Sequence, residues 1–81
     1  MDYLANHIEA LVFCSPKPIT EDEIQSCLKE MFEADVPMED ISGGIAKLGE
    51  KYEDEQFSFG LVQSGGGYQF LTKPAYQASI S

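Results

Sequence analysis

The sequence contains no arginine and no tryptophan, and only five of its 81 residues are basic, all of them lysine. Fourteen Asp and Glu residues outweigh these lysines and give a formal net charge of -9. Arginine supplies the planar fork that binds guanine or phosphate through two hydrogen bonds at once. The absence of arginine from so acidic a chain argues against nucleic acid as a direct partner.

Long hydrophobic runs are also missing. The longest strongly apolar stretch covers only residues 11–14, whereas a helix that crosses a bilayer needs about 20 apolar residues. We therefore expect no membrane span. The two cysteines, Cys14 and Cys27, form neither a CxxC pair nor a wider metal-ligand pattern, and nothing resembles a secretory signal. We interpret them as buried structural thiols in a reducing, cytoplasmic compartment, and we expect no metal and no cofactor.

The residue types needed for catalysis are not arranged for it. His7 is the only histidine, and no Ser or Cys lies in a recognisable nucleophile motif. The glycine-rich run at residues 64–67 opens no helix and lacks a following Lys-Ser or Lys-Thr, so it is interpreted as a turn instead of a phosphate cradle. We predict no catalytic residues and no enzymatic activity, with His7 at the surface or in an interface.

The length allows one small domain, which buries about 60% of the surface that the unfolded chain exposes. Apolar residues recur at helical spacing from Tyr3 to Cys14, with Asp2 placed to cap this first helix. Thr20 and Glu23 form a capping box that predicts the start of a second helix. The apolar residues on either side of this box occupy the positions of a hydrophobic staple.

A third helix is predicted to open at Pro37, which suits a first helical position. Gly43, Gly44 and Gly49 weaken this prediction, since each costs about 1 kcal/mol relative to Ala inside a helix. Their missing side chains would let another backbone approach closely. One face of the second helix is predicted to be apolar and to consist of Ile24, Cys27, Leu28, Met31 and Phe32. The core is predicted to contain at least one strand aromatic together with Leu4, Ile8, Leu11, Ile24, Leu28, Ile41, Ile45 and Leu48.

A β-hairpin is predicted after the acidic break at residues 53–55. Large apolar residues alternate with small ones from residue 57 to residue 61, and the turn at 64–67 leads into a second strand at 68–72. Three helices followed by a hairpin is the element order of a winged helix. We therefore predict an α+β fold of this class, as a single domain over residues 1–81, with the start of a further helix at Pro74.

Three stretches carry a resemblance to a known family. They are IEALVF at residues 8–13, KPI at residues 17–19 and GGYQFLTKPAY at residues 66–76. The chain resembles the N-terminal winged-helix domain of the segregation and condensation protein B (ScpB) family, accessory subunits of the SMC-kleisin condensin. The last stretch resembles the family's glycine-rich turn, aromatic strand and threonine-lysine-proline step into the final helix.

This resemblance implies a function and a set of partners. It implies a homodimer formed largely through this domain, and a partnership with the kleisin (ScpA-like) subunit and, through it, with SMC. The role implied is in chromosome condensation and segregation, at a cytoplasmic site associated with the nucleoid. The chain is then expected to be the N-terminal half of a longer two-domain protein.

The hairpin is predicted to be apolar on both faces. Phe57, Phe59 and Leu61 project to one side and Val62 to the other. A three-helix core can cover only one face, so the second stays in water unless a partner covers it, and a two-fold dimer is the commonest closed arrangement. The candidate interface residues are Tyr3, His7, Val62, Tyr68, Phe70, Leu71 and Tyr76. The alternative is that strand twist or the last helix buries the surplus apolar surface.

Two functions therefore compete. The first is a structural subunit of a chromosome-organising complex, which the acidic composition and the absence of arginine favour. The second is a winged-helix transcription regulator whose dimer places basic residues on DNA.

Overall fold

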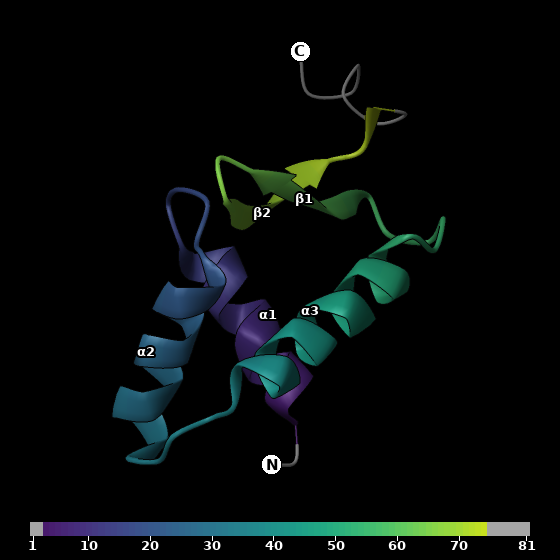
Figure 1. Cartoon of the computed structure of the whole chain (residues 1–81). Helices are drawn as coiled ribbons and strands as arrows, with labels where there is room; N and C mark the ends of the chain where they lie inside the picture. The colour runs from purple at the N-terminus through teal and green to yellow at the C-terminus, as the bar shows by residue number, and fades with distance from the viewer. Residues whose placement is uncertain (1–2, 75–81) are drawn as a thin grey trace.

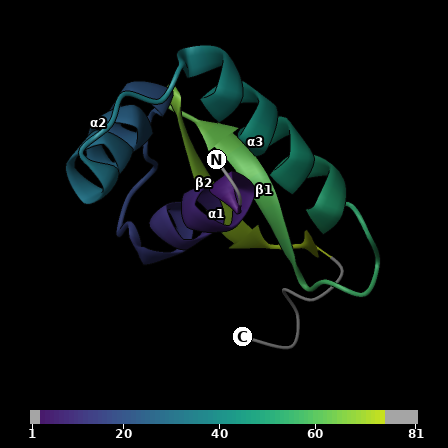
Figure 2. The ribbon, with the colours of Figure 1, turned by 90° about the horizontal axis from the view of Figure 1, so that it is seen from below.

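The structure is a computed structural model that describes residues 3–74. In chain order it contains α1 (Leu4–Cys14), α2 (Glu21–Phe32), α3 (Met38–Tyr52), β1 (Phe59–Ser64) and β2 (Gly67–Thr72). The hairpin lies across one end of the helices, over α1 and α3, as Figure 1 and the view from below in Figure 2 show. This arrangement confirms the predicted α+β winged helix.

The start of α2 forms as its sequence predicts. The Thr20 hydroxyl accepts a hydrogen bond from the Glu23 backbone N–H at 3.1 Å, and the Glu23 carboxylate accepts one from the Thr20 N–H at 3.0 Å. Ile19 and Ile24, at the staple positions, are both buried. The capping box therefore fixes the first residue of α2, and the staple fixes the angle at which the chain enters it.

The other two helices begin one residue later than predicted. The N-cap of α1 is Tyr3 in a left-handed conformation (φ 63°), where we had expected Asp2, a residue outside the described range. The N-cap of α3 is Pro37, whose ψ of 141° is extended, so the first helical residue is Met38. Proline fixes φ but leaves ψ free, so the sequence predicts the first residue of α3 only to within one position.

The hydrophobic core joins all three helices and the loops beside them. Its buried members are Ile8, Val12, Ile19, Ile24, Leu28, Val36, Ile41, Ile45, Leu48 and Tyr52. Leu4 and Leu11 pack against this set as half-buried residues, as do Tyr68 and Phe70 from β2. The predicted core is confirmed in outline, with Ile19 and Val36 added from the loops. The Gln25 amide donates to the Val36 carbonyl at 2.8 Å, which holds the loop before α3 against α2.

The predicted apolar face of α2 is only partly covered, and the prediction that both thiols are buried is wrong. Met31 and Phe32, in the last turn of α2, are 53% and 37% exposed, and Phe32 is covered on one side by the His7 ring of α1. The thiols are not buried either, since Cys14 is exposed at the last residue of α1 and Cys27 is half-buried at the margin of the α2 face. Helical periodicity indicates on which face of a helix a side chain lies. It does not indicate whether neighbouring elements cover that part of the helix.

Only one of the three helical glycines marks a close approach. A Cβ added at Gly44 would lie 2.6 Å from the Cδ1 of Ile8 on α1, whereas one added at Gly43 or Gly49 would meet nothing within 4 Å. Gly44 therefore allows α3 to pack closely against α1.

The hairpin pairs its strands in a register that runs from Phe59 opposite Thr72 to Ser64 opposite Gly67. Gly65 and Gly66 make the turn with φ of 56° and 81°, a conformation suited to glycine. On its other side, β2 pairs with the loop after α1, where Ile19 and Tyr68 exchange two backbone hydrogen bonds of 3.0 and 2.7 Å.

Candidate protein-interaction surface

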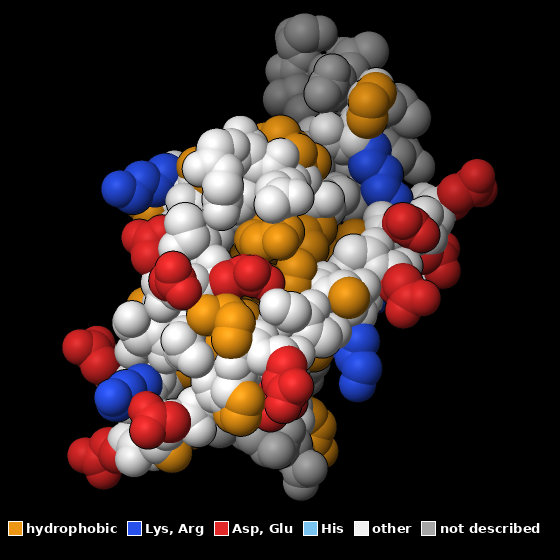
Figure 3. Space-filling model, in the orientation of Figure 1, with side chains coloured by type: hydrophobic (Ala, Val, Ile, Leu, Met, Phe, Trp, Pro, Cys, Tyr) orange, Lys and Arg blue, Asp and Glu red, His pale blue; other side chains and the backbone are white. Residues whose placement is uncertain are grey.

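Charge is distributed very unevenly over the domain. All 14 acidic residues lie within residues 2–55, and residues 56–72 carry no charged side chain. Acidic side chains accordingly gather over α2 and α3 in Figure 3, whereas the hairpin is mostly white and orange. The hairpin is a neutral element on an acidic domain.

The outer face of the hairpin, which points away from the helices, carries exposed apolar side chains. Because Val62 lies opposite Gln69, its diagonal neighbour on the same face is Leu71. Val62 is 37% exposed and Leu71 is 45% exposed. Within the described residues, these two side chains form an apolar patch on the outer face.

A second apolar feature lies where the end of α1 meets the hairpin. The Phe13 ring stacks on Phe70, with centroids 4.6 Å apart, and meets the edge of Phe59 at 6.1 Å. Phe13 and Phe59 remain about half exposed, whereas Phe70 packs against the core. We name these three residues the aromatic cluster. The cluster therefore extends from the buried inner face of the hairpin to the surface of the domain.

The opposite end of α1 carries a third feature. The His7 imidazole packs edge-on against Phe32 of α2, with ring centroids 4.8 Å apart. Tyr3, one turn before His7, is exposed and borders a groove of about 490 Å³ between the starts of α1 and α3. Glu39, Asp40 and Lys47 also line this groove, which is therefore polar along its α3 side.

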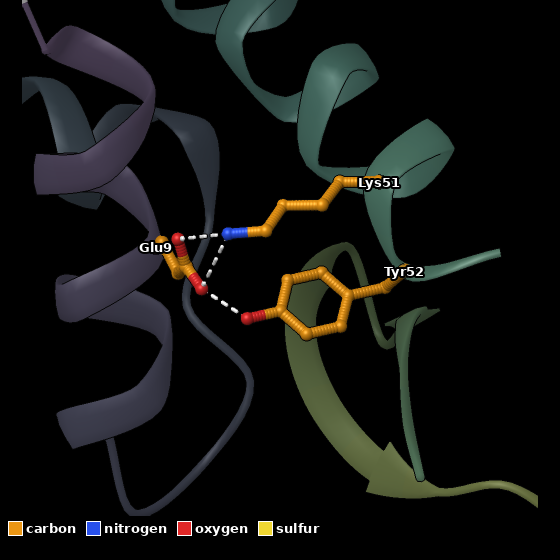
Figure 4. A network of polar contacts seen from close by, with 3 residues as sticks. All are labelled: Glu9, Lys51 and Tyr52. Atoms are coloured by element: carbon orange, nitrogen blue, oxygen red, sulfur yellow. Dashed lines mark hydrogen bonds and ion pairs between the residues drawn. The ribbon is translucent and has the colours of Figure 1, made fainter. Parts of the chain in front are cut away.

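A polar network ties α1 to the end of α3 (Figure 4). The Tyr52 phenol donates a hydrogen bond to the Glu9 carboxylate, and the Lys51 ammonium contacts the same carboxylate at 3.3 Å. Burial, the hydrogen bond to Glu9 and the negative charge of Glu9 raise the pKa of Tyr52 to about 12. All three groups have partners within the fold, so we assign this network to stability and not to chemistry.

The structure separates the predicted interface residues into three places. Val62 and Leu71 lie together on the outer face, whereas Tyr68 and Phe70 lie on the inner face and pack half-buried on the core. Tyr3 and His7 lie at the N-terminal end of α1, far from the hairpin (Figure 1). Tyr76 lies outside the described residues.

Sequence reasoning missed Phe13 and Phe32 as candidate surface residues. Phe13 directly follows Val12, the last residue of the α1 core stripe, and an apolar residue off such a stripe indicates exposed apolar surface. This signal was available in the sequence. Phe32 gave no such signal, because its position is on the apolar face of α2.

Neither a metal site nor a membrane span was found among residues 3–74. In that range no three His, Cys, Asp or Glu residues are grouped so that they could hold a metal ion. None of the helices there has the length and apolar character needed to cross a bilayer.

Comparison with known proteins gives a family match and several structural matches. Residues 6–81 match the family model described as segregation and condensation complex subunit ScpB. No curated protein matches the chain. A crystal structure of a dimer of the ScpB N-terminal domain complexed with a ScpA peptide is 20% identical, with a TM-score of 0.83 over 99% of this chain and 89% of that one.

Two longer structures are also similar. ScpB from Mycobacterium tuberculosis is 15% identical with a TM-score of 0.81, over 98% of this chain and 46% of that one. A conserved hypothetical protein from Chlorobium tepidum is 25% identical with a TM-score of 0.69, over 95% of this chain and 45% of that one. The chain thus spans less than half the length of these two proteins. The family match covers nearly the whole sequence, and the chain therefore belongs to the ScpB family of segregation and condensation complex subunits.

Proposed function

We propose that this chain is a non-enzymatic, cytoplasmic subunit of an SMC-kleisin complex that acts in chromosome condensation and segregation. It works by self-association and by binding the kleisin subunit, through which it reaches SMC. The observation that carries this proposal is the neutral hairpin, which presents exposed apolar side chains on a domain of net charge -9. We further propose that the chain makes up the N-terminal half of a two-domain protein.

Self-association is supported by the surface that the fold leaves uncovered. The inner face of the hairpin packs on the core, while Val62 and Leu71 on the outer face and Phe13 and Phe59 at its edge stay exposed. Exposed apolar patches of this kind commonly mark protein interfaces. The similar ScpB N-terminal domain was crystallised as a dimer with a ScpA peptide, which supports both partnerships as proposals for this chain.

The competing function, a DNA-binding regulator, fits the charges poorly. In a winged helix that binds DNA, the third helix enters the major groove. Here α3 and its C-cap carry Glu39, Asp40, Glu50 and Glu53 against two lysines, and the hairpin offers no cation. Such a surface repels the phosphate backbone, on which even non-specific binding depends.

Two titrations test the proposal. With the kleisin subunit of the same cell, calorimetry should give saturable binding, and the chain should co-purify with both kleisin and SMC. With duplex DNA at roughly 50 mM salt, where screening is weak, no binding should be measurable. Micromolar DNA affinity that falls steeply with added salt, together with no heat from kleisin, would favour the regulator.

A further inference from the structure

The free edge of β1 has a definite hydrogen-bonding pattern. The Ser58 carbonyl accepts a hydrogen bond from the Lys73 N–H at 2.8 Å, so Ser58 faces β2. In an antiparallel pair, the backbone groups of successive residues face the partner strand and the outside in turn. Because the register is continuous from residue 59 to residue 64, Phe59, Leu61 and Gln63 turn their N–H and C=O groups away from β2.

The two edges of the hairpin differ. The outer edge of β2 is covered where Tyr68 exchanges two hydrogen bonds with Ile19. Among the described residues, no backbone hydrogen bond links β1 to anything other than β2. Natural edge strands are usually protected by lysine, proline or a bulge. The β1 sequence FGLVQS has no such residue, and its register has no bulge.

We infer that β1 pairs edge to edge with β1 of a second copy of this chain, antiparallel, about a two-fold axis at Leu61. This inference rests on the proposed self-association and specifies its geometry. Leu61 then lies opposite Leu61 of the second copy, and Phe59 lies opposite Gln63. All three outward-facing residues find partners, about six backbone hydrogen bonds form, and the two hairpins become one four-stranded sheet.

The distribution of charge favours a second copy of this chain as the partner of the free β1 edge. Two chains of net charge -9 repel each other over most orientations, and at physiological salt that repulsion acts over about 8 Å. Pairing at β1 joins the two copies through a strand that lies within the uncharged segment 56–72, so no acidic side chain lies on the paired strands. It also brings the exposed Val62 side chains of the two copies near each other on the outer face of the sheet.

Residue-resolved amide hydrogen exchange on the intact chain tests the inference. Gly60 and Val62 face β2, so their amides should be protected at every protein concentration. The Leu61 and Gln63 amides should exchange at least roughly tenfold more slowly when the concentration is raised into the range where the mass doubles. Concentration-dependent protection at every second amide along β1 indicates edge pairing, because burial of one hairpin face would not produce this alternation.

A pair of variants at one position adds a second test. Gln63→Pro removes an outward-facing N–H and leaves the β1–β2 ladder intact, whereas Gln63→Ala removes the exposed side chain and keeps the N–H. Self-association should weaken on the order of tenfold or more in the proline variant, and it should hardly change in the alanine variant. Circular dichroism establishes whether each variant is folded. Should the proline variant not fold, the exchange measurement on the unaltered chain still decides.

The outcomes separate this inference from the function on which it rests. A doubled mass with fast exchange at Leu61 and Gln63 would overturn the edge pairing and leave self-association through another surface. Protection of these amides only after addition of a kleisin segment would assign the edge to that segment and overturn the inference. A single-chain mass at all concentrations would contradict both the pairing and the self-association.

Discussion

The phenol of Tyr52, in the last turn of α3, donates a hydrogen bond to the carboxylate of Glu9 in the middle of α1. The ring of Tyr52 is buried, and it also packs against Phe57 and Phe70 at centroid distances of 4.7 and 4.8 Å. One side chain thus links both helices to the hairpin. Tyr52 is therefore one of the residues that hold the hairpin on the helices.

Tyr52→Phe should keep the ring packing and lose the hydrogen bond. A hydrogen bond to a charged group contributes about 1.5 to 3 kcal/mol, and we expect a loss of free energy of unfolding at the low end because Lys51 still pairs with Glu9. Urea denaturation at pH 7 measures the loss. An unchanged midpoint would mean that the hydrogen bond to Glu9 does not stabilise the fold.

The same pair predicts how stability changes at high pH. Folding raises the pKa of Tyr52 from 10.0 to about 12, so the folded chain keeps this proton more tightly than the unfolded chain does. The resulting stabilisation is complete below pH 10 and is lost as the pH rises towards 12. Urea denaturation from pH 8 to pH 11.5 should show a steeper decline for the unaltered chain than for Tyr52→Phe. Parallel curves would contradict the raised pKa, since the two proteins differ only in the hydroxyl of residue 52.

The adjacent glycines of α3 should respond differently to alanine. Gly43→Ala adds a methyl group in open space and should raise the free energy of unfolding by about 1 kcal/mol through helix propensity alone. Gly44→Ala gains the same helix propensity but places a Cβ 2.6 Å from the Cδ1 of the fully buried Ile8, so the end of that side chain must move within the core. Overpacking costs about 1 to 3 kcal/mol and should cancel or exceed the gain. Thermal unfolding of the two variants compares them directly. Equal effects of the two substitutions would show that α1 does not pack closely at Gly44.

Leu48→Ala should be strongly destabilising because Leu48, on the buried face of α3, is only 2% exposed. Truncation of a buried leucine costs about 2 to 5 kcal/mol, a large share of the stability of a small domain. Met31→Ala is the matched control, since Met31 is 53% exposed and surface changes usually stay within about 0.5 kcal/mol. A similar loss in both variants would place the end of α2 in the core after all.

The features that sequence predicted well are those fixed by neighbouring residues. Thr20 and Glu23 are three residues apart, and their side chains form the predicted capping box. The stripe of Ile41, Ile45 and Leu48 is likewise buried as its helical spacing indicates. Such patterns act within one turn, so they do not depend on how the elements are arranged.

The features that sequence could not predict depend on contacts between distant segments. Glu9 and Tyr52 are 43 residues apart, and nothing in the sequence indicates that their side chains form a hydrogen bond. The exposure of Phe32 depends on the direction in which α2 leaves the core. For the candidate interface, sequence indicated apolar residues on both hairpin faces, but only the register shows that Val62 and Leu71 lie together and that Tyr68 and Phe70 face the core.

Self-association through uncharged, apolar surface is the central claim, and the molecular mass in solution tests it most directly. Light scattering on a size-exclusion column, over roughly 1 to 100 µM protein, follows the mass-action shift that a dimer must show. We predict a mass that rises with concentration to twice the 9.0 kDa of one chain. Added salt should not lower this mass, because it screens the repulsion between two acidic chains and the uncharged surface needs no ion pairs. A mass of one chain at every concentration would contradict the account.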